Sequence, residues 1–288
     1  MNSVTLFLYC FFIVDATLFG IIIGSFLNVV IYRIPEGRTI VKGHSMCMTC
    51  GHTLAAKDLV PLFSWLFLKG KCRYCGAPVP SRYAKIESFT GLVFLISALS
   101  HLETAFFLVD PDAFLSIFAS FVLFVLACCA AISAMMIYHD TGKGYLQLAL
   151  ISIISGILAT AICLYKNNAD VNYWLLSLLV VIAGVVVFVI LMKVIFVFFK
   201  KTYSKADTMA DLTIAGLLFN REFTILVTKL GYLKTSCIEI ILFGIVYGVI
   251  RASLKNTKKE KISVILGFLV IVILVILRYS YMKIIYNF

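Results

Sequence analysis

Long apolar stretches recur along this chain and constrain what it can fold into. A helix needs about 20 mostly apolar residues to cross a bilayer, and 62% of the 288 residues are hydrophobic, with a mean hydropathy of +1.05. The predicted spans are 5–32, 88–108, 113–138, 145–165, 173–199, 211–228, 236–254 and 262–280. They predict an all-α polytopic membrane protein with about eight transmembrane helices.

The net charge of +11 is concentrated in certain loops between these spans. The loop 33–87 contains Arg33, Arg38, Lys42, Lys57, Lys69, Lys71, Arg73, Arg82 and Lys85. The positive-inside rule therefore places this loop in the cytoplasm, with both chain termini outside. Basic loops in such positions set topology and meet anionic membrane lipid, so the charge does not indicate a nucleic-acid partner.

Four cysteines of the loop have the spacing of a metal site. Cys47 and Cys50 form one Cys-x-x-Cys pair, and Cys72 and Cys75 form a second pair after 21 intervening residues. Zinc favours four thiolates held by short turns, and a closed shell of four leaves no position open for water. The loop is therefore predicted to bind one structural zinc. Two disulfides are the alternative, disfavoured by the reducing cytoplasm.

These features divide the chain into three predicted parts: a first transmembrane helix at 1–32, a zinc-binding loop domain at 33–87 and a transmembrane core at 88–288. Aromatic residues in the loop, Trp65 with Phe63 and Phe67, are predicted to rest at the membrane interface, where such side chains are enriched.

Two aspartates stand where apolar spans meet the cytoplasm. Asp140 follows the third span, and Asp211 opens the sixth. Two carboxylates that share a proton can activate water and protonate a leaving amine, because their proximity separates their pKa values. The alternative is that both are helix-end residues, favoured there by capping and the helix dipole. Asp207, one helical turn before Asp211, is a rival for its role.

One block of sequence resembles a known family. Residues 24–35 read Gly-Ser-Phe-Leu-Asn-Val-Val-Ile-Tyr-Arg-Ile-Pro, and the similarity continues through both cysteine pairs to 87–91, Glu-Ser-Phe-Thr-Gly. This block resembles the bacterial prepilin peptidases, the type IV leader peptidases. The remaining chain is similar to them in topology and at two short motifs.

The resemblance implies an enzyme of the bacterial inner membrane that cleaves the basic leader from type IV prepilins or from the pseudopilins of secretion systems. Cleavage is expected at the cytoplasmic face, with 88–288 as the aspartic peptidase core and Asp140 and Asp211 as the catalytic pair. In many members a second activity, associated with the region 33–87, methylates the new N-terminus with S-adenosylmethionine. Asp58, Glu87 and Asp207 are candidates to bind the basic leader.

The chain also departs from the family pattern. Gln147 and Leu148 replace a proline and an Asp or Asn after Asp140, and the segment 208–211, Thr-Met-Ala-Asp, lacks both glycines that usually precede the second aspartate. A Pro-Phe-Gly-Pro-like element is absent near 261–264, whereas 214–217, Ile-Ala-Gly-Leu, still resembles the family and favours Asp211 over Asp207.

Two alternatives to a peptidase follow. The chain would be a membrane binding or assembly protein, or a methyltransferase alone, if it has lost proteolysis. It would be a transporter if the acidic residues Asp15 and Glu239 within apolar spans mark an ion path, although this does not account for the four cysteines.

Overall fold

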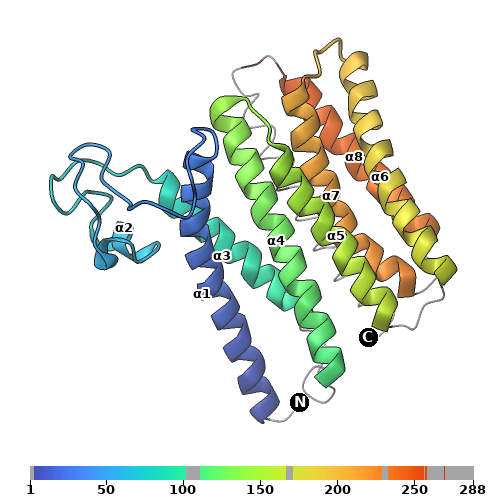
Figure 1. Cartoon of the computed structure of the whole chain (residues 1–288), viewed down its shortest axis with the longest axis horizontal. Helices are drawn as coiled ribbons and strands as arrows, with labels where there is room; N and C mark the ends of the chain where they lie inside the picture. Colours follow the sequence, from blue (N-terminus) through green and yellow to red (C-terminus); the bar gives the residue numbers. More distant parts are fainter. Residues whose placement is uncertain are drawn as a thin grey trace. The chain divides into compact units, whose positions relative to one another are not determined.

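The computed structural model describes residues 3–101, 111–166, 171–228, 233–255, 257 and 269. Apart from two isolated β-bridges, the regular structure of these residues is helical. The helices are α1 (Ser3–Arg33), η1 (Ala56–Asp58), α2 (Phe63–Phe67), α3 (Arg82–His101), α4 (Pro111–Thr141), α5 (Leu146–Lys166), α6 (Val171–Phe198), α7 (Lys205–Thr228) and α8 (Leu233–Leu254). The chain divides into two compact units, Met1–Leu99 and Ser100–Phe288 (Figure 1).

The predicted spans up to residue 254 each coincide with a helix, and the prediction at 262–280 lies outside the described residues. Within the described part, three helices are long and apolar enough to cross a membrane, at Leu6–Arg33, Phe118–Thr141 and Val181–Phe198. These helices are typical of a multi-pass membrane protein, and the number of eight spans stays a prediction.

Two helices begin six residues earlier than the predicted spans. α3 starts at Arg82 instead of 88, and α7 starts at Lys205 instead of 211. Hydropathy marks only the apolar part of a helix, whereas hydrogen bonding extends each helix into the polar residues before it. Ser204 and Asp207 form a capping box at the start of α7, because the N–H of each bonds the side chain of the other, at 3.2 and 2.8 Å.

In the first unit, α1 and α3 approach closely at glycines. A Cβ at Gly20 would lie 2.6 Å from Cβ of Phe94, and one at Gly24 would lie 2.7 Å from Cα of Glu87. From the other side, a Cβ at Gly91 would lie 2.5 Å from Cγ1 of Ile21. Small residues of this kind let membrane helices pack backbone to backbone.

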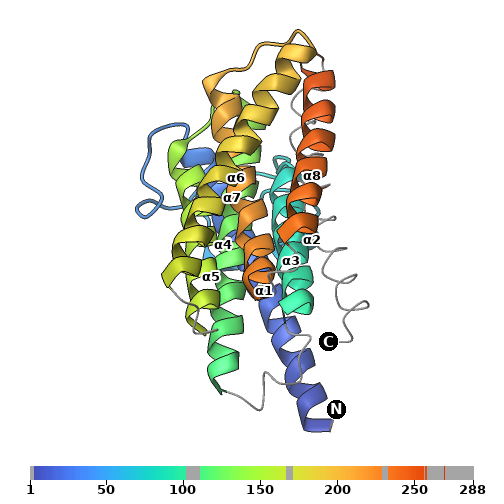
Figure 2. The ribbon, with the colours of Figure 1, turned by 90° about the vertical axis from the view of Figure 1, so that its right-hand side faces the viewer.

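In the second unit, α5 packs against α4 and α7, and α6 packs against α7 and α8 (Figure 2). The approach of α5 and α7 depends on Gly216, where a Cβ would lie 2.7 Å from the backbone nitrogen of Ile153. Nearby, the hydroxyl of Ser152 donates to the carbonyl of Thr213 at 2.8 Å. This arrangement gives a physical reason for the glycine in the segment 214–217.

Candidate functional site

The four cysteines predicted to bind zinc come together in the loop between α1 and α3. The sulfurs of Cys47, Cys50, Cys72 and Cys75 all lie within 4.8 Å of one another, and those of Cys47 and Cys75 are 3.9 Å apart. Zn–S bonds of about 2.3 Å put the sulfurs of a tetrahedron about 3.8 Å apart, whereas a disulfide needs about 2.05 Å. All four residues are free thiols, so the cluster has the dimensions of a single metal site.

Each cysteine pair is held by a turn with the same hydrogen bonds. In the first turn, the N–H of Cys47 donates to the carbonyl of His52 at 2.9 Å, and the N–H of Gly51 donates to the carbonyl of Cys47 at 2.8 Å. The second turn repeats both bonds around Cys72 and Gly76, at 2.8 and 2.9 Å. The two glycines have φ angles of +70° and +71°, a conformation that favours glycine and reverses the chain after each pair.

The metal-free thiols differ in acidity. Backbone N–H groups of Cys50 and Thr49 donate to the sulfur of Cys47 and lower its pKa to about 6. At Cys75 the N–H of Ala77 lowers the pKa, but desolvation and the neighbouring sulfurs outweigh it and raise the pKa to about 11. Metal binding requires thiolates, so Cys47 is already poised to bind a metal, whereas Cys75 must first lose a proton.

Asp58 links the two turns. Its carboxylate accepts hydrogen bonds from Nε of Arg73 at 2.6 Å and from the hydroxyl of Tyr74 at 2.7 Å, both inside the second cysteine pair. The ring of Tyr74 packs on His52, beside the first pair, with centroids 3.6 Å apart. Arg73, and then Tyr74, lower the pKa of Asp58, so its carboxylate stays charged at neutral pH.

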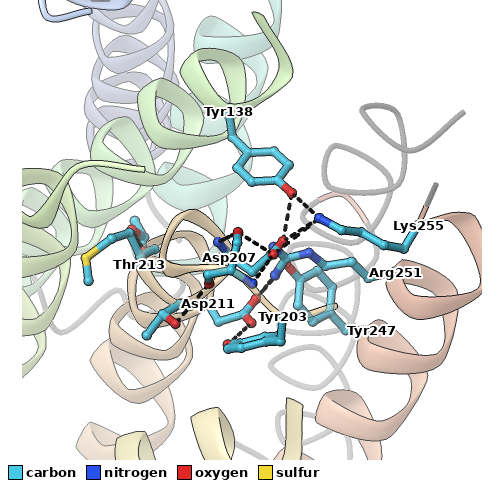
Figure 3. A network of polar contacts seen from close by, with 11 residues as sticks. Tyr138, Tyr203, Asp207, Asp211, Thr213, Tyr247, Arg251 and Lys255 are labelled. Atoms are coloured by element: carbon cyan, nitrogen blue, oxygen red, sulfur yellow. Dashed lines mark hydrogen bonds and ion pairs between the residues drawn. The ribbon is translucent and has the colours of Figure 1, made fainter. Parts of the chain in front are cut away.

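A second polar cluster is buried among α4, α7 and α8 (Figure 3). At its centre is Arg251 of α8, with a side chain that is 1% exposed. The guanidinium bridges two carboxylates of α7, because Nη2 lies 2.6 Å from Oδ1 of Asp207 and Nη1 bonds Oδ1 of Asp211. It also lies 5.4 Å from the ring centroid of Tyr138 and 5.6 Å from that of Phe196, within the range of cation–π attraction.

Asp207 is bonded by several further groups. The hydroxyl of Tyr138 donates to it at 2.7 Å, and Nζ of Lys255 lies 3.2 Å from both of its oxygens. The N–H and hydroxyl of Ser204 donate to Oδ2 at 2.8 and 2.6 Å. Two carboxylates thus face two cations, and the charges of the four side chains balance.

Both oxygens of Asp211 are also engaged. The hydroxyl of Tyr203 donates to Oδ2 at 2.5 Å, and that of Tyr247 donates to Oδ1 at 3.2 Å. Asp211 is fully buried and lies nearly two turns inside α7. This differs from the expectation that it opens the helix, because the capping box starts α7 at Lys205.

Asp140 lies in the last turn of α4, and its side chain is 26% exposed. Its Oδ1 lies 3.0 Å from Nδ1 of His139. The turn that follows packs on the start of α7, since a Cβ at Gly144 would lie 2.6 Å from Cβ of Met209. The end of α4 and the start of α7 are therefore neighbours, while the pairing of Asp140 with Asp211 stays a prediction.

Sequence reasoning missed the basic half of this cluster. Arg251 interrupts the apolar segment 236–254, and a charge inside such a segment needs a buried partner; that signal points to an acidic residue on a neighbouring helix. Lys255 directly follows the same segment, and its ammonium group faces Asp207.

The candidates for leader binding all have partners inside the protein. Asp58 is held by Arg73, and Asp207 is held by Arg251 and Lys255. Glu87 is buried and accepts the N–H of Leu62 at 2.6 Å. In this structure the three carboxylates therefore contact groups of the protein itself.

The fold and these two sites define a helical membrane protein with a cluster of four cysteines that could hold a metal ion and a buried cluster of acidic, basic and tyrosine side chains. Residues 18–101 match the family described as Bacterial Peptidase A24 N-terminal domain. Over this segment the chain is similar to prepilin peptidases, in agreement with the resemblance seen in the sequence.

Individual relatives agree with this assignment. The chain is 51% identical over 75 residues to a prepilin leader peptidase/N-methyltransferase of Myxococcus xanthus, covering 26% of this chain and 22% of the relative. It is 40% identical over 102 residues to an Escherichia coli protein named type 4 prepilin-like proteins leader peptide-processing enzyme. This match covers 29% of this chain and 38% of the relative. The match thus spans well under half the length of either relative. No solved structure matches the chain significantly.

Proposed function

We propose that this chain is a membrane aspartic endopeptidase that removes the basic leader from type IV prepilins or pseudopilins. The observation that carries the proposal is the match of residues 18–101 to relatives named as prepilin-processing enzymes. Two carboxylates in the second unit, the partly exposed Asp140 and the buried Asp211, support the chemistry, because hydrolysis of a peptide bond needs groups that move protons.

Asp140 and Asp211 are the proposed catalytic pair. With a proton shared between them, one carboxyl polarises the scissile carbonyl while the other takes a proton from the attacking water, and the leaving amine is then protonated. The packing of the α4–α5 turn against the start of α7 supports this pairing. In the free protein, Arg251 and two tyrosines hold Asp211 in place.

The metal of the loop is proposed to be zinc with a structural role. The spacing of the four sulfurs and the two matching turns support zinc, and four thiolates would fill its coordination shell. The ion would hold together a segment with too few buried apolar residues to fold on its own.

Methylation of the new N-terminus is proposed as a second activity, with S-adenosylmethionine as the methyl donor. The support is the name leader peptidase/N-methyltransferase carried by the relatives. We place the enzyme in the bacterial inner membrane, with its active site at the cytoplasmic face, because the basic loop 33–87 follows the positive-inside rule.

A second candidate is a family member that has lost proteolysis and acts in assembly or in methylation alone. The balanced cluster around Arg251 favours it, because Asp207 and Asp211 are both paired internally. The missing glycines before Asp211 point the same way.

Co-expression with a prepilin tests both candidates. The expected result is a pilin shortened by its leader and heavier by one methyl group at the new N-terminus, measured by mass spectrometry. An uncut prepilin together with a stably inserted enzyme would exclude the peptidase and leave the second candidate.

A further inference from the structure

Four apolar side chains stand exposed on one short segment of the loop. Val60, Phe63, Leu66 and Phe67 are exposed, and Phe67 reaches 81%. The N–H of Ser64 donates to the carbonyl of Val60 at 2.9 Å, which extends the turn before α2. Phe63, Leu66 and Phe67 lie at spacings of three and four residues on one face of α2. Together with Val60, just before the helix, they form what is here called the α2 surface.

The opposite face of this segment is anchored in the protein. Nε1 of Trp65 donates to the carbonyl of Val79 at 3.0 Å, and its ring covers Gly70, where a Cβ would lie 2.9 Å away. The α2 surface is therefore presented outward by a fixed helix.

The depth of α2 along α1 is set by a chain of close contacts. The N–H of Leu62, directly before α2, donates to the carboxylate of Glu87 at 2.6 Å. Glu87 in turn abuts Gly24 of α1. Arg33 is the last residue of this membrane-capable helix, and Gly24 stands nine residues before it. Nine residues of α-helix correspond to about 13 Å along the axis.

Figure 1 shows the same relation, with α2 level with the C-terminal half of α1 instead of beyond its end. An apolar surface at this depth beside a spanning helix would face lipid. Exposed Lys69 and Lys71 follow α2 directly. Cationic side chains beside an apolar face are the pattern of segments that bind anionic bilayers.

We propose that the α2 surface docks into the interfacial layer of an anionic bilayer, with its apolar side chains among the upper acyl chains and the two lysines at the headgroups. The contact fixes the position of the metal-binding loop against the membrane. This proposal does not depend on the proposed peptidase activity.

A tryptophan reporter in the full-length protein tests the proposal. The chain has two tryptophans, Trp65 and Trp174, so Trp174→Phe is the background in which Phe67→Trp is added. Val41→Trp in the same background is the matched control, because Val41 is 86% exposed but lies in the turn held by Arg33 at the end of α1. Each variant is reconstituted in phosphatidylcholine–phosphatidylglycerol vesicles, with lipids brominated near the headgroup end of the acyl chains.

The fluorescence added by Phe67→Trp should be quenched by the brominated lipid and protected from aqueous iodide, with depths of about 5–10 Å below the headgroup boundary. The fluorescence added by Val41→Trp should be quenched by aqueous iodide and not by the brominated lipid. Quenching by iodide at both positions would overturn the proposal. Protection of Phe67→Trp from both quenchers would also overturn it, since protein would then cover the surface. Equal lipid quenching in pure phosphatidylcholine would refute the preference for anionic lipid.

Discussion

At the scale of single residues, the guanidinium of Arg251 faces both carboxylates of α7 and lies against aromatic rings. Burying such a charge is costly, and the attraction of its partners offsets the cost only while both remain in place. Removing one charge from the cluster leaves its partners buried without compensation. The contribution of Arg251 can therefore be measured as a change in the free energy of unfolding.

Arg251→Met should lower the free energy of unfolding of the second unit by about 3–5 kcal/mol, because the buried carboxylates of Asp207 and Asp211 would both lose the guanidinium that bridges them. Thermal unfolding in detergent measures the change. Arg38→Met is the matched control, since Arg38 pairs with Glu36 at the surface at 3.0 Å, and exposed pairs contribute about 0–1 kcal/mol. Equal losses in the two variants would contradict the buried ion-pair network.

Asp140→Asn and Asp211→Asn should each reduce prepilin cleavage by about 10²–10⁴-fold or more, because each removes a proton-transfer group. Asp140 is partly exposed, so Asp140→Asn should leave the unfolding temperature unchanged. Asp207→Asn should be destabilising, because Asp207 caps α7 and faces two cations. Cleavage and unfolding are measured on the same preparations. A fully active Asp140→Asn variant would refute the proposed catalytic pair.

The sequence identified the acidic residues at the ends of apolar stretches, because charge stands out against hydrocarbon. It did not reveal that Asp207 and Asp211 meet Arg251, since this depends on which helices pack together. The residues that join the cluster come from α4, from α7 with the segment before it, and from α8 with the residue after it, and no local pattern connects positions so far apart in the chain.

At the scale of elements, the cysteine loop was the most predictable part of the fold. Metal-ligand spacing is local, and each pair with its following glycine encodes one turn. Helix starts were less predictable, as α3 and α7 show, because hydropathy does not register capping. The link from Asp58 to the second cysteine pair was also not predicted, since it joins separate parts of the loop.

Asp58→Asn should weaken zinc binding by about 10–100-fold, as is typical for residues that orient metal ligands. The lost charge removes the ion pair with Arg73 and frees the turn that presents Cys72 and Cys75. Competition with a zinc-binding dye measures the affinity. Glu36→Gln is the control, because it also removes one negative charge from the loop; this variant should bind zinc with unchanged affinity. Unchanged affinity in Asp58→Asn would show that the second turn needs no support.

At the scale of the whole molecule, the two compact units have separate sources of stability. The first contains the glycine-packed α1 and α3 and the cysteine loop, and the second contains α4–α8 with the buried cluster. The proposed metal is expected to order the first unit, whereas helix packing and paired charges stabilise the second.

Removing the metal with a strong chelator should therefore expose the loop without unfolding the second unit. Limited proteolysis should cut between residues 38 and 81, and added zinc should restore protection. The unfolding temperature of the second unit should not change on chelation. Its transition is recognised as the one that Arg251→Met shifts. A shift of that transition on chelation would mean that the metal stabilises both units together.

The balanced charges of the buried cluster also bear on how the protein is made. Helix α8 leaves the ribosome after α7, and its arginine is expensive to leave in hydrocarbon without a partner. The carboxylates of α7 provide that partner, so the two helices are expected to settle in the bilayer as a pair. Asp207 and Asp211 would then be needed during biogenesis, before the finished protein meets any substrate.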